Sequence, residues 1–206
     1  HAVTLFERDE AGGGLLRFGV PDFKIEKTVV ERRLRQLADE GVEFRYGVDV
    51  GVDVTAEELL DSFDAVVLAT GSRVPRDLPV PGRELDGVHF AMEYLYGRNR
   101  AVAGSAEPTL SATGKHVIVI GGGDTGADCV ASAHREGAAS VTQIELLGEP
   151  PETRPDDVTP WPRWPRKLRT SYALHEGCER SFAVSTTHLS GEDGCVRVIH
   201  WQHNSG

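Results

Sequence analysis

The chain has 206 residues, a net charge of −10 at pH 7, 39% hydrophobic residues and 26% charged residues. This composition is ordinary for one large or two small globular domains, and the negative charge argues against a nucleic-acid partner. No apolar run approaches the roughly 18 residues of a membrane helix, and no signal or transit pattern is present. We therefore expect a cytoplasmic protein without a membrane or nucleic-acid partner.

The cysteines Cys129, Cys178 and Cys195 are far apart in the sequence and form no CxxC pair. This usage is typical of a reducing compartment and provides no iron–sulfur or zinc framework, so we expect no metal site. The sequence starts at once in a strand-like run and stops after Gly206 without a closing element. We therefore expect an excerpt of a longer polypeptide.

The first strand-like run covers residues 3–6 and ends in Glu7, which Arg8 follows. In a dinucleotide-binding fold, an acidic residue that closes a strand holds the adenosine ribose. A carboxylate at a strand end is more commonly just exposed to solvent. Glu7 and Arg8 are therefore candidate ligands, and the solvated alternative stays open.

Helical and turn patterns follow in the first third of the chain. Residues 15–21 are apolar but irregular, and residues 26–40 have a helical apolar face that ends at Gly41. The other elements expected here are short strands at 42–46 and 48–52 and a short helix opened by a capping box between Thr55 and Glu58.

Residues 64–72 form a second apolar run, which predicts a strand buried on both faces that ends in a glycine turn. The turn, at Thr70 and Gly71, would face a ligand at the carboxyl edge of a sheet. Prolines then predict a stiff connector, and we place a domain boundary at residue 82. Beyond it we expect a short helix at 91–96 and a polar loop at 101–114.

The strongest motif begins with four β-branched residues at 117–120, which predict a strand buried on both faces. Gly121-x-Gly123-x-x-Gly126 follows and leads into a helical pattern that runs to Glu136. Strand, glycine turn and helix are the context of a dinucleotide-binding fingerprint. Gly121 allows the sharp turn, Gly123 lets the backbone approach a pyrophosphate, and Gly126 lets the helix pack closely.

The free N–H groups and the positive dipole end of this helix would hold the anion. A parallel strand at 140–145 ends in Glu145, 19 residues after Gly126, and an acidic residue about 20 positions on holds the ribose hydroxyl. This continuation favours a nicotinamide-nucleotide site over a purely structural βαβ unit. The candidate ligands are Gly121, Gly122, Gly123, Asp124, Thr125, Gly126 and Glu145.

Six prolines between residues 150 and 165 exclude a regular helix, and Trp161 and Trp164 lie among them. We expect a packed irregular loop, in which Arg154 is a candidate phosphate partner. The last expected elements are the two strands of an antiparallel hairpin, 182–187 and 196–201.

Four stretches of the sequence resemble the small (beta) subunit of glutamate synthase, and the resemblance runs over nearly the whole chain. The first, at 13–24, and the last, PPETR with WPRWP, are specific to that family. The other two, VLATG and IGGGDTGADC, are shared with many flavin reductases. These stretches cover residues 13–24, 67–71, 120–129 and 150–154 with 161–165.

The resemblance implies an α/β fold with two Rossmann-like dinucleotide-binding domains of the glutathione-reductase type, both incomplete here. Residues 1–82 would form the central part of the FAD-binding domain, and residues 83–206 would form most of the NAD(P)H-binding domain. By the same resemblance, Glu7 would lie at the adenosine ribose, Leu15 and Leu16 near the flavin, and Thr70 and Gly71 at a second flavin-contacting turn.

The resemblance also implies an electron-input function. NAD(P)H would deliver a hydride to FAD, and electrons would pass through iron–sulfur clusters outside this chain to the large (alpha) subunit. That subunit makes L-glutamate from L-glutamine and 2-oxoglutarate. The cluster cysteines and the FAD fingerprint are missing from this sequence, so we expect the chain alone to be inactive. Because hydride transfer depends on placement of the cofactors, we nominate no catalytic side chain.

Two alternatives stay open. One is another flavin-dependent NAD(P)H reductase, such as a relative of thioredoxin reductase, which should carry a redox CxxC. The other is a non-catalytic docking module of the same fold. The choice of nucleotide is also open, because Glu145 favours NADH whereas Arg154 could pair with the 2′-phosphate of NADPH. We favour NADPH, since Arg154 lies in a stretch specific to the family.

Overall fold

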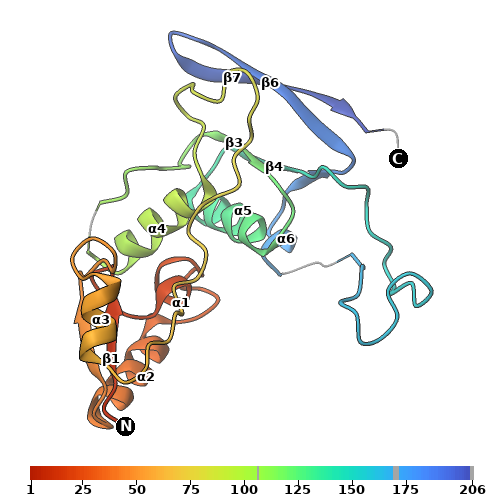
Figure 1. Cartoon of the computed structure of the whole chain (residues 1–206). Coiled ribbons are helices and arrows are strands. Elements are labelled where there is room, and N and C mark those ends of the chain that lie inside the picture. The colour runs from red at the N-terminus through yellow and green to blue at the C-terminus, as the bar shows by residue number, and fades with distance from the viewer. Residues whose placement is uncertain (106, 169–171, 205–206) are drawn as a thin grey trace.

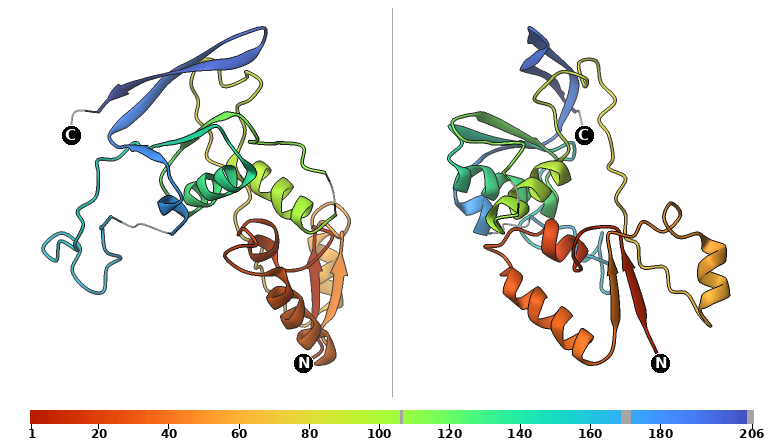
Figure 2. Two further views of the ribbon diagram at one scale, coloured as in Figure 1. Left: turned by 180° about the vertical axis from the view of Figure 1, so that it is seen from behind. Right: turned by 90° about the vertical axis from the view of Figure 1, so that its left-hand side faces the viewer.

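Residues 1–105, 107–168 and 172–204 are described by the structure, a computed structural model. The fold is α/β and contains three small sheets along its length (Figure 1). An N-terminal part with two parallel strands lies at one end, and a parallel sheet with helices lies in the middle. An antiparallel hairpin lies at the other end, and the views in Figure 2 agree on this order. No helix of the described ranges is long and apolar enough to cross a membrane.

The N-terminal part pairs strand β1 (Thr4–Glu7) in parallel with β2 (Glu43–Tyr46). Three helices accompany this sheet: α1 (Gly14–Phe18), α2 (Lys27–Asp39) and α3 (Ala56–Ser62). The predicted end of α2 is confirmed, because Gly41 takes a φ of +99° directly after the last turn. The predicted capping box of α3 is confirmed too, with Thr55 and Glu58 each bonded to the other's backbone N–H.

Two local predictions in this part are wrong. Residues 15–21 are not wholly irregular, because residues 14–18 form the single-turn helix α1, which Gly13 opens with a φ of +115°. Residues 48–52 form no strand, because the chain turns back on itself there. The only ladder contact described in this stretch is the isolated bridge between Val50 and Val54.

The predicted buried strand at 64–72 is also wrong. This stretch has no regular secondary structure, and Val67 and Leu68 are 86% and 81% exposed. A strand gains its stability from a hydrogen-bonded neighbour. In the part of the chain that the structure describes, β1 and β2 pair only with each other, so the run at 64–72 has no neighbouring strand.

The proline-containing connector leads from the N-terminal part to the hairpin (Figure 1). Pro81 accepts a hydrogen bond from Leu189 N–H, and Asp86 exchanges backbone bonds with Gly194 and Val196. Gly82 has a φ of +84°, and an added Cβ would overlap the Leu189 carbonyl. The connector is therefore packed against the hairpin around the boundary that we predict at residue 82.

The middle part carries the main core. Its sheet has the order β3-β4-β5, all parallel, with β3 (His116–Ile120), β4 (Ser140–Ile144) and β5 (Glu179–Ser181). Helix α5 (Asp124–Glu136) connects β3 to β4, and α4 (Ala91–Val102) packs on α5. The short helix α6 (Tyr172–His175) precedes β5. The core cluster is built from Leu95, Ala112, Val119, Cys129, Val130, Ala133 and Val141.

The predicted strand, glycine turn, helix and strand at 117–145 are thus confirmed. Helix α4 is longer than the predicted 91–96, because Leu95 and Asn99 both bury against neighbouring elements and extend its inner face. This shortens the predicted polar loop at 101–114, of which residue 106 lies outside the described residues.

The C-terminal region contains the proline-rich segment and the hairpin. The segment at 150–168 is irregular as predicted, but its tryptophans are not buried in it, because Trp161 and Trp164 are 83% and 77% exposed. The predicted hairpin is confirmed, with β6 (Val184–Glu192) antiparallel to β7 (Cys195–His203). Both strands extend beyond the predicted ranges because the ladder continues to the turn.

Candidate nucleotide-binding site

The glycine turn between β3 and α5 lies at the carboxyl edge of the parallel sheet. Gly121 takes a φ of +115°, a conformation that favours glycine, and its N–H donates to the Ile144 carbonyl at 2.8 Å. Gly123, Asp124 and Thr125 are exposed, and no atom lies within 4 Å of a Cβ added at Gly123. The backbone at the N-terminus of α5 is therefore accessible to an anion, and binding of a pyrophosphate there stays a prediction.

The floor of the turn is held by close packing. A Cβ added at Gly126 would overlap the Gly121 carbonyl oxygen, so only glycine lets α5 approach β3 this closely. The fully buried Gln143 on β4 donates from Nε2 to that same carbonyl at 3.0 Å. The predicted roles of Gly121 and Gly126 in the turn are confirmed, and Gln143 is a supporting residue that the sequence pattern did not single out.

Glu145 reaches over the turn from the end of β4. Its carboxyl group lies where a side chain at Gly122 would have to go. The Nη2 of Arg180 donates to Glu145 Oε1 at 2.9 Å, and the side chains of both residues are 18% exposed. The structure therefore brings the predicted ribose ligand to the fingerprint and adds a cation beside it.

Arg154 has its contacts within the proline-rich segment. Its guanidinium donates to the backbone carbonyls of Thr159 and Arg163 at 2.6 and 3.1 Å, and it pairs with Asp156 at 3.1 Å. These contacts fold the loop onto itself. A role for Arg154 as a phosphate ligand stays a prediction, and it would require the guanidinium to leave these partners.

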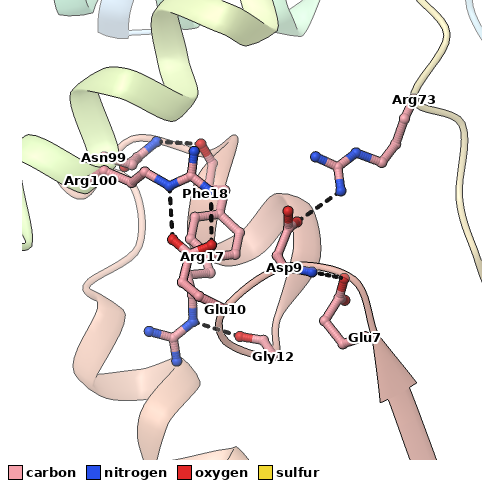
Figure 3. A network of polar contacts seen from close by, with 9 residues as sticks. All are labelled: Glu7, Asp9, Glu10, Gly12, Arg17, Phe18, Arg73, Asn99 and Arg100. Atoms are coloured by element: carbon pink, nitrogen blue, oxygen red, sulfur yellow. Dashed lines mark hydrogen bonds and ion pairs between the residues drawn. The ribbon is translucent and has the colours of Figure 1, made fainter. Parts of the chain in front are cut away.

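The second group of predicted residues lies around the end of β1. Glu7 Oε1 accepts a hydrogen bond from Asp9 N–H at 3.0 Å (Figure 3). Arg8 is exposed, with Asp49 3.9 Å away. On the neighbouring α1, Leu15 and Leu16 are 56% and 52% exposed. The leucines are available to a planar apolar ligand, whereas Glu7 is partly engaged by its own turn.

Arg73 brings the exposed turn at Thr70 and Gly71 toward the same end of β1. Its Nη1 donates to the buried carboxyl of Asp9 at 2.8 Å (Figure 3). Gly71 has a φ of +67° and open space around it. The turn at Thr70 and Gly71, which we predict to contact the flavin, therefore lies shortly before Arg73, the residue that contacts Asp9. The strand expected before this turn is absent.

Helix α4 fixes α1 in place. The buried Asn99 donates from Nδ2 to the carbonyls of Phe18 and Gly19 at 2.9 and 3.3 Å. Arg100 forms two 2.8 Å bonds to Glu10 and lies over the Phe18 ring at 5.2 Å (Figure 3). These contacts join the two groups of candidate ligands through one helix. No motif pointed to Asn99 or Arg100, because their partners lie about eighty to ninety residues away.

A cavity of about 260 Å³ lies between residues 21–23 and the helices α4 and α5, and Arg98, Asn99 and Arg135 line it. Within the described ranges, no three His, Cys, Asp or Glu side chains gather to hold a metal. Burial raises the pKa of Cys129 to about 12, which makes this thiol a poor nucleophile.

Comparison with known proteins gives the family. A family model described as pyridine nucleotide-disulphide oxidoreductase matches residues 15–161. The glutamate synthase [NADPH] small chain of Mycobacterium tuberculosis (strain H37Rv) is 51% identical over 205 residues. The match covers 97% of this chain and 42% of that protein. The glutamate synthase [NADH] of Schizosaccharomyces pombe is 45% identical, over 100% of this chain and 10% of that protein.

Solved structures show the same fold. FprA of Mycobacterium tuberculosis in complex with NADPH has a TM-score of 0.71 at 19% identity, over 99% of this chain and 57% of that one. The thioredoxin reductase of T. acidophilum has a TM-score of 0.59 at 15% identity, over 99% and 63%. This chain spans about two fifths of the bacterial glutamate synthase small chain that it matches at 51%. With a family model matched over residues 15–161, the chain belongs to the pyridine nucleotide-disulphide oxidoreductase family.

Proposed function

We propose that this chain is part of the small subunit of a cytoplasmic glutamate synthase. The whole protein passes electrons from NAD(P)H to FAD, for the synthesis of L-glutamate from L-glutamine and 2-oxoglutarate. The 51% identity to a glutamate synthase small chain over 97% of this chain supports the assignment. The large subunit is the partner, and the iron–sulfur clusters lie outside this chain.

The observation that carries the proposal is the glycine turn with Glu145 over it. The open backbone at Gly123 fits a pyrophosphate, and the carboxyl group at Gly122 fits a ribose hydroxyl. These residues bind and orient a nicotinamide nucleotide. We assign residues 83–206 to the NAD(P)H-binding domain on this basis, and residues 1–82 to the central part of the FAD-binding domain.

In the FAD-binding part, this chain supplies one side of a site. Glu7 and Arg8 at the end of β1 would hold the adenosine ribose, and Leu15 and Leu16 would lie along the flavin. When bound, FAD supplies the acceptor for the hydride of NAD(P)H. The chain's own residues position the two cofactors for the transfer, which requires no acid–base side chain.

The test uses the full-length protein with FAD and its large subunit. NADPH or NADH is added without oxygen, and the bleaching of the flavin absorbance and the formation of L-glutamate are followed. We expect both, and we expect Gly123→Ala to slow flavin reduction. Flavin that stays oxidised with either nucleotide would refute the electron-input function and favour a docking module.

A further inference from the structure

Arg180 is a cation at the candidate site that no motif pointed to. It lies on β5, opposite Gln143 of β4 in the register of the parallel sheet. Its partner Glu145 is 35 residues earlier, at the end of the neighbouring strand. Because β5 has only three residues, its pattern is too short to identify in the sequence. Only the pairing of β5 with β4 places Arg180 beside the glycine turn.

The guanidinium of Arg180 has hydrogen-bonding capacity to spare. A guanidinium carries five N–H donors, and one of those on Arg180 binds Glu145. Its Nε is buried and has no hydrogen-bond partner among the residues that the structure describes. The ring of Phe182 lies 4.8 Å from the guanidinium carbon and limits how the group can turn. The Arg180 side chain is 18% exposed, so an incoming anion would bind the accessible N–H groups of the guanidinium rather than the buried Nε.

The surroundings also decide the sign of the charge that the site accepts. Glu145 alone would attract a ribose hydroxyl and repel a phosphate. Arg180, 2.9 Å from Glu145 Oε1, offsets the repulsion of that carboxylate and places guanidinium N–H donors beside the position of the ribose. An arginine at this place accommodates the 2′-phosphate that distinguishes NADPH from NADH.

We propose that Arg180 binds the 2′-phosphate of NADPH and makes the chain select NADPH over NADH. This role of Arg180 rests on the nucleotide site of the proposed function. Glu145 holds the guanidinium in place before the nucleotide arrives. Arg154 is the competing candidate, but its guanidinium already binds two backbone carbonyls and Asp156. Arg180 contacts the ribose ligand Glu145, whereas the described contacts of Arg154 all lie within the proline-rich segment.

The test is a titration of the purified chain with four probes. These are NADPH, NADH, adenosine 2′,5′-bisphosphate and 5′-AMP, and binding is measured by calorimetry. The variants are Arg180→Gln, Arg180→Lys and, as the matched control, Arg154→Ala. We expect Arg180→Gln to weaken binding of NADPH relative to NADH, and of the bisphosphate relative to 5′-AMP, about tenfold or more, the value of a charge-assisted bond. Arg180→Lys keeps the charge and should retain part of the preference.

The outcomes separate this inference from the function on which it rests. Binding of neither nucleotide to the wild-type chain would refute the nucleotide site and Arg180 with it. Binding of both, with a ratio that Arg180→Gln leaves unchanged, would refute only the role of Arg180. Loss of NADPH affinity in Arg154→Ala alone would assign the phosphate to Arg154. Circular dichroism checks that each variant is folded, and if Arg180→Gln does not fold, Arg180→Lys against Arg154→Ala decides.

Discussion

Two glycines of the same turn have different tasks. Gly126 is needed for packing, because a Cβ there would overlap the Gly121 carbonyl. Gly123 faces open space, and its φ of −74° is one that any residue adopts. The first is therefore a residue of the fold, and the second is a residue of the proposed site.

We predict that Gly126→Ala lowers the free energy of unfolding by about 1–3 kcal/mol, the usual cost of overpacking. Gly123→Ala should cost less than about 1 kcal/mol, because it only exchanges one helix-capping residue for a poorer one. It should nonetheless weaken NADPH binding, since its methyl group would stand where the pyrophosphate lies. Denaturant unfolding and nucleotide titration of both variants check this. Equal unfolding costs would contradict the division of tasks.

At the scale of elements, helix α4 holds the N-terminal part against the middle part. The buried Asn99 of this helix donates hydrogen bonds to two backbone carbonyls at the end of α1. In the Arg100–Glu10 ion pair, by contrast, the side chains are 34% and 54% exposed. Buried hydrogen bonds to carbonyls without other donors contribute more than exposed ion pairs. Asn99 is therefore the stronger link between these elements.

We predict that Asn99→Ala lowers the free energy of unfolding by about 1–3 kcal/mol, because the carbonyls of Phe18 and Gly19 lose a buried donor. Glu10→Gln removes an exposed ion pair and should cost less than about 1 kcal/mol. Urea unfolding of both variants is the measurement. A larger loss in Glu10→Gln would show that charge, not the buried amide, joins the elements.

Glu136, the last residue of α5, makes the free energy of unfolding depend on pH in the acid range. Burial alone would raise the pKa of Glu136, but bonds from the Ala112 N–H, the Ser111 hydroxyl and Tyr94, with the nearby charge of Arg98, hold it below the ordinary 4.5. A carboxyl group whose folded pKa is lowered stabilises the protein above its unfolded pKa and loses this contribution as pH falls through the folded value. We predict that Glu136→Gln flattens the decline of Tm below pH 4.5. A decline of Tm below pH 4.5 that is as steep in Glu136→Gln as in the wild-type chain would contradict this.

At the scale of the whole molecule, the sequence predicts the elements whose partners are close in the chain. The unit at 117–145, the helix at 26–40, the capping box and the hairpin could be predicted because their patterns are local. The apolar pattern at 64–72 wrongly predicts a strand, because a strand forms only beside another strand and the local pattern does not contain that neighbour. Arg180 and Asn99 could not be found, because their roles depend on contacts 35 and about 80 residues away.

A flavin site needs a pyrophosphate-binding turn of its own. The sequence contains one G-x-G-x-x-G turn, at 121–126, and Glu7, at the end of β1, already accepts a bond from Asp9 N–H. A pyrophosphate needs a helix N-terminus such as the one after a fingerprint. We predict that the purified chain of 206 residues carries little FAD and reduces no dye with NADPH. A flavin absorbance near one equivalent after gel filtration would contradict this.

The central claim is that the turn at 121–126 binds the nucleotide, and amide NMR of the labelled chain during an NADPH titration tests it most directly. We expect the largest shifts at the N–H groups of the exposed residues 123–125 and at Glu145, with Gly123→Ala reducing them. The cavity between residues 21–23 and α4 is the competing place. Shifts concentrated at residues 21–23 and Asn99, with the turn unchanged, would contradict the account.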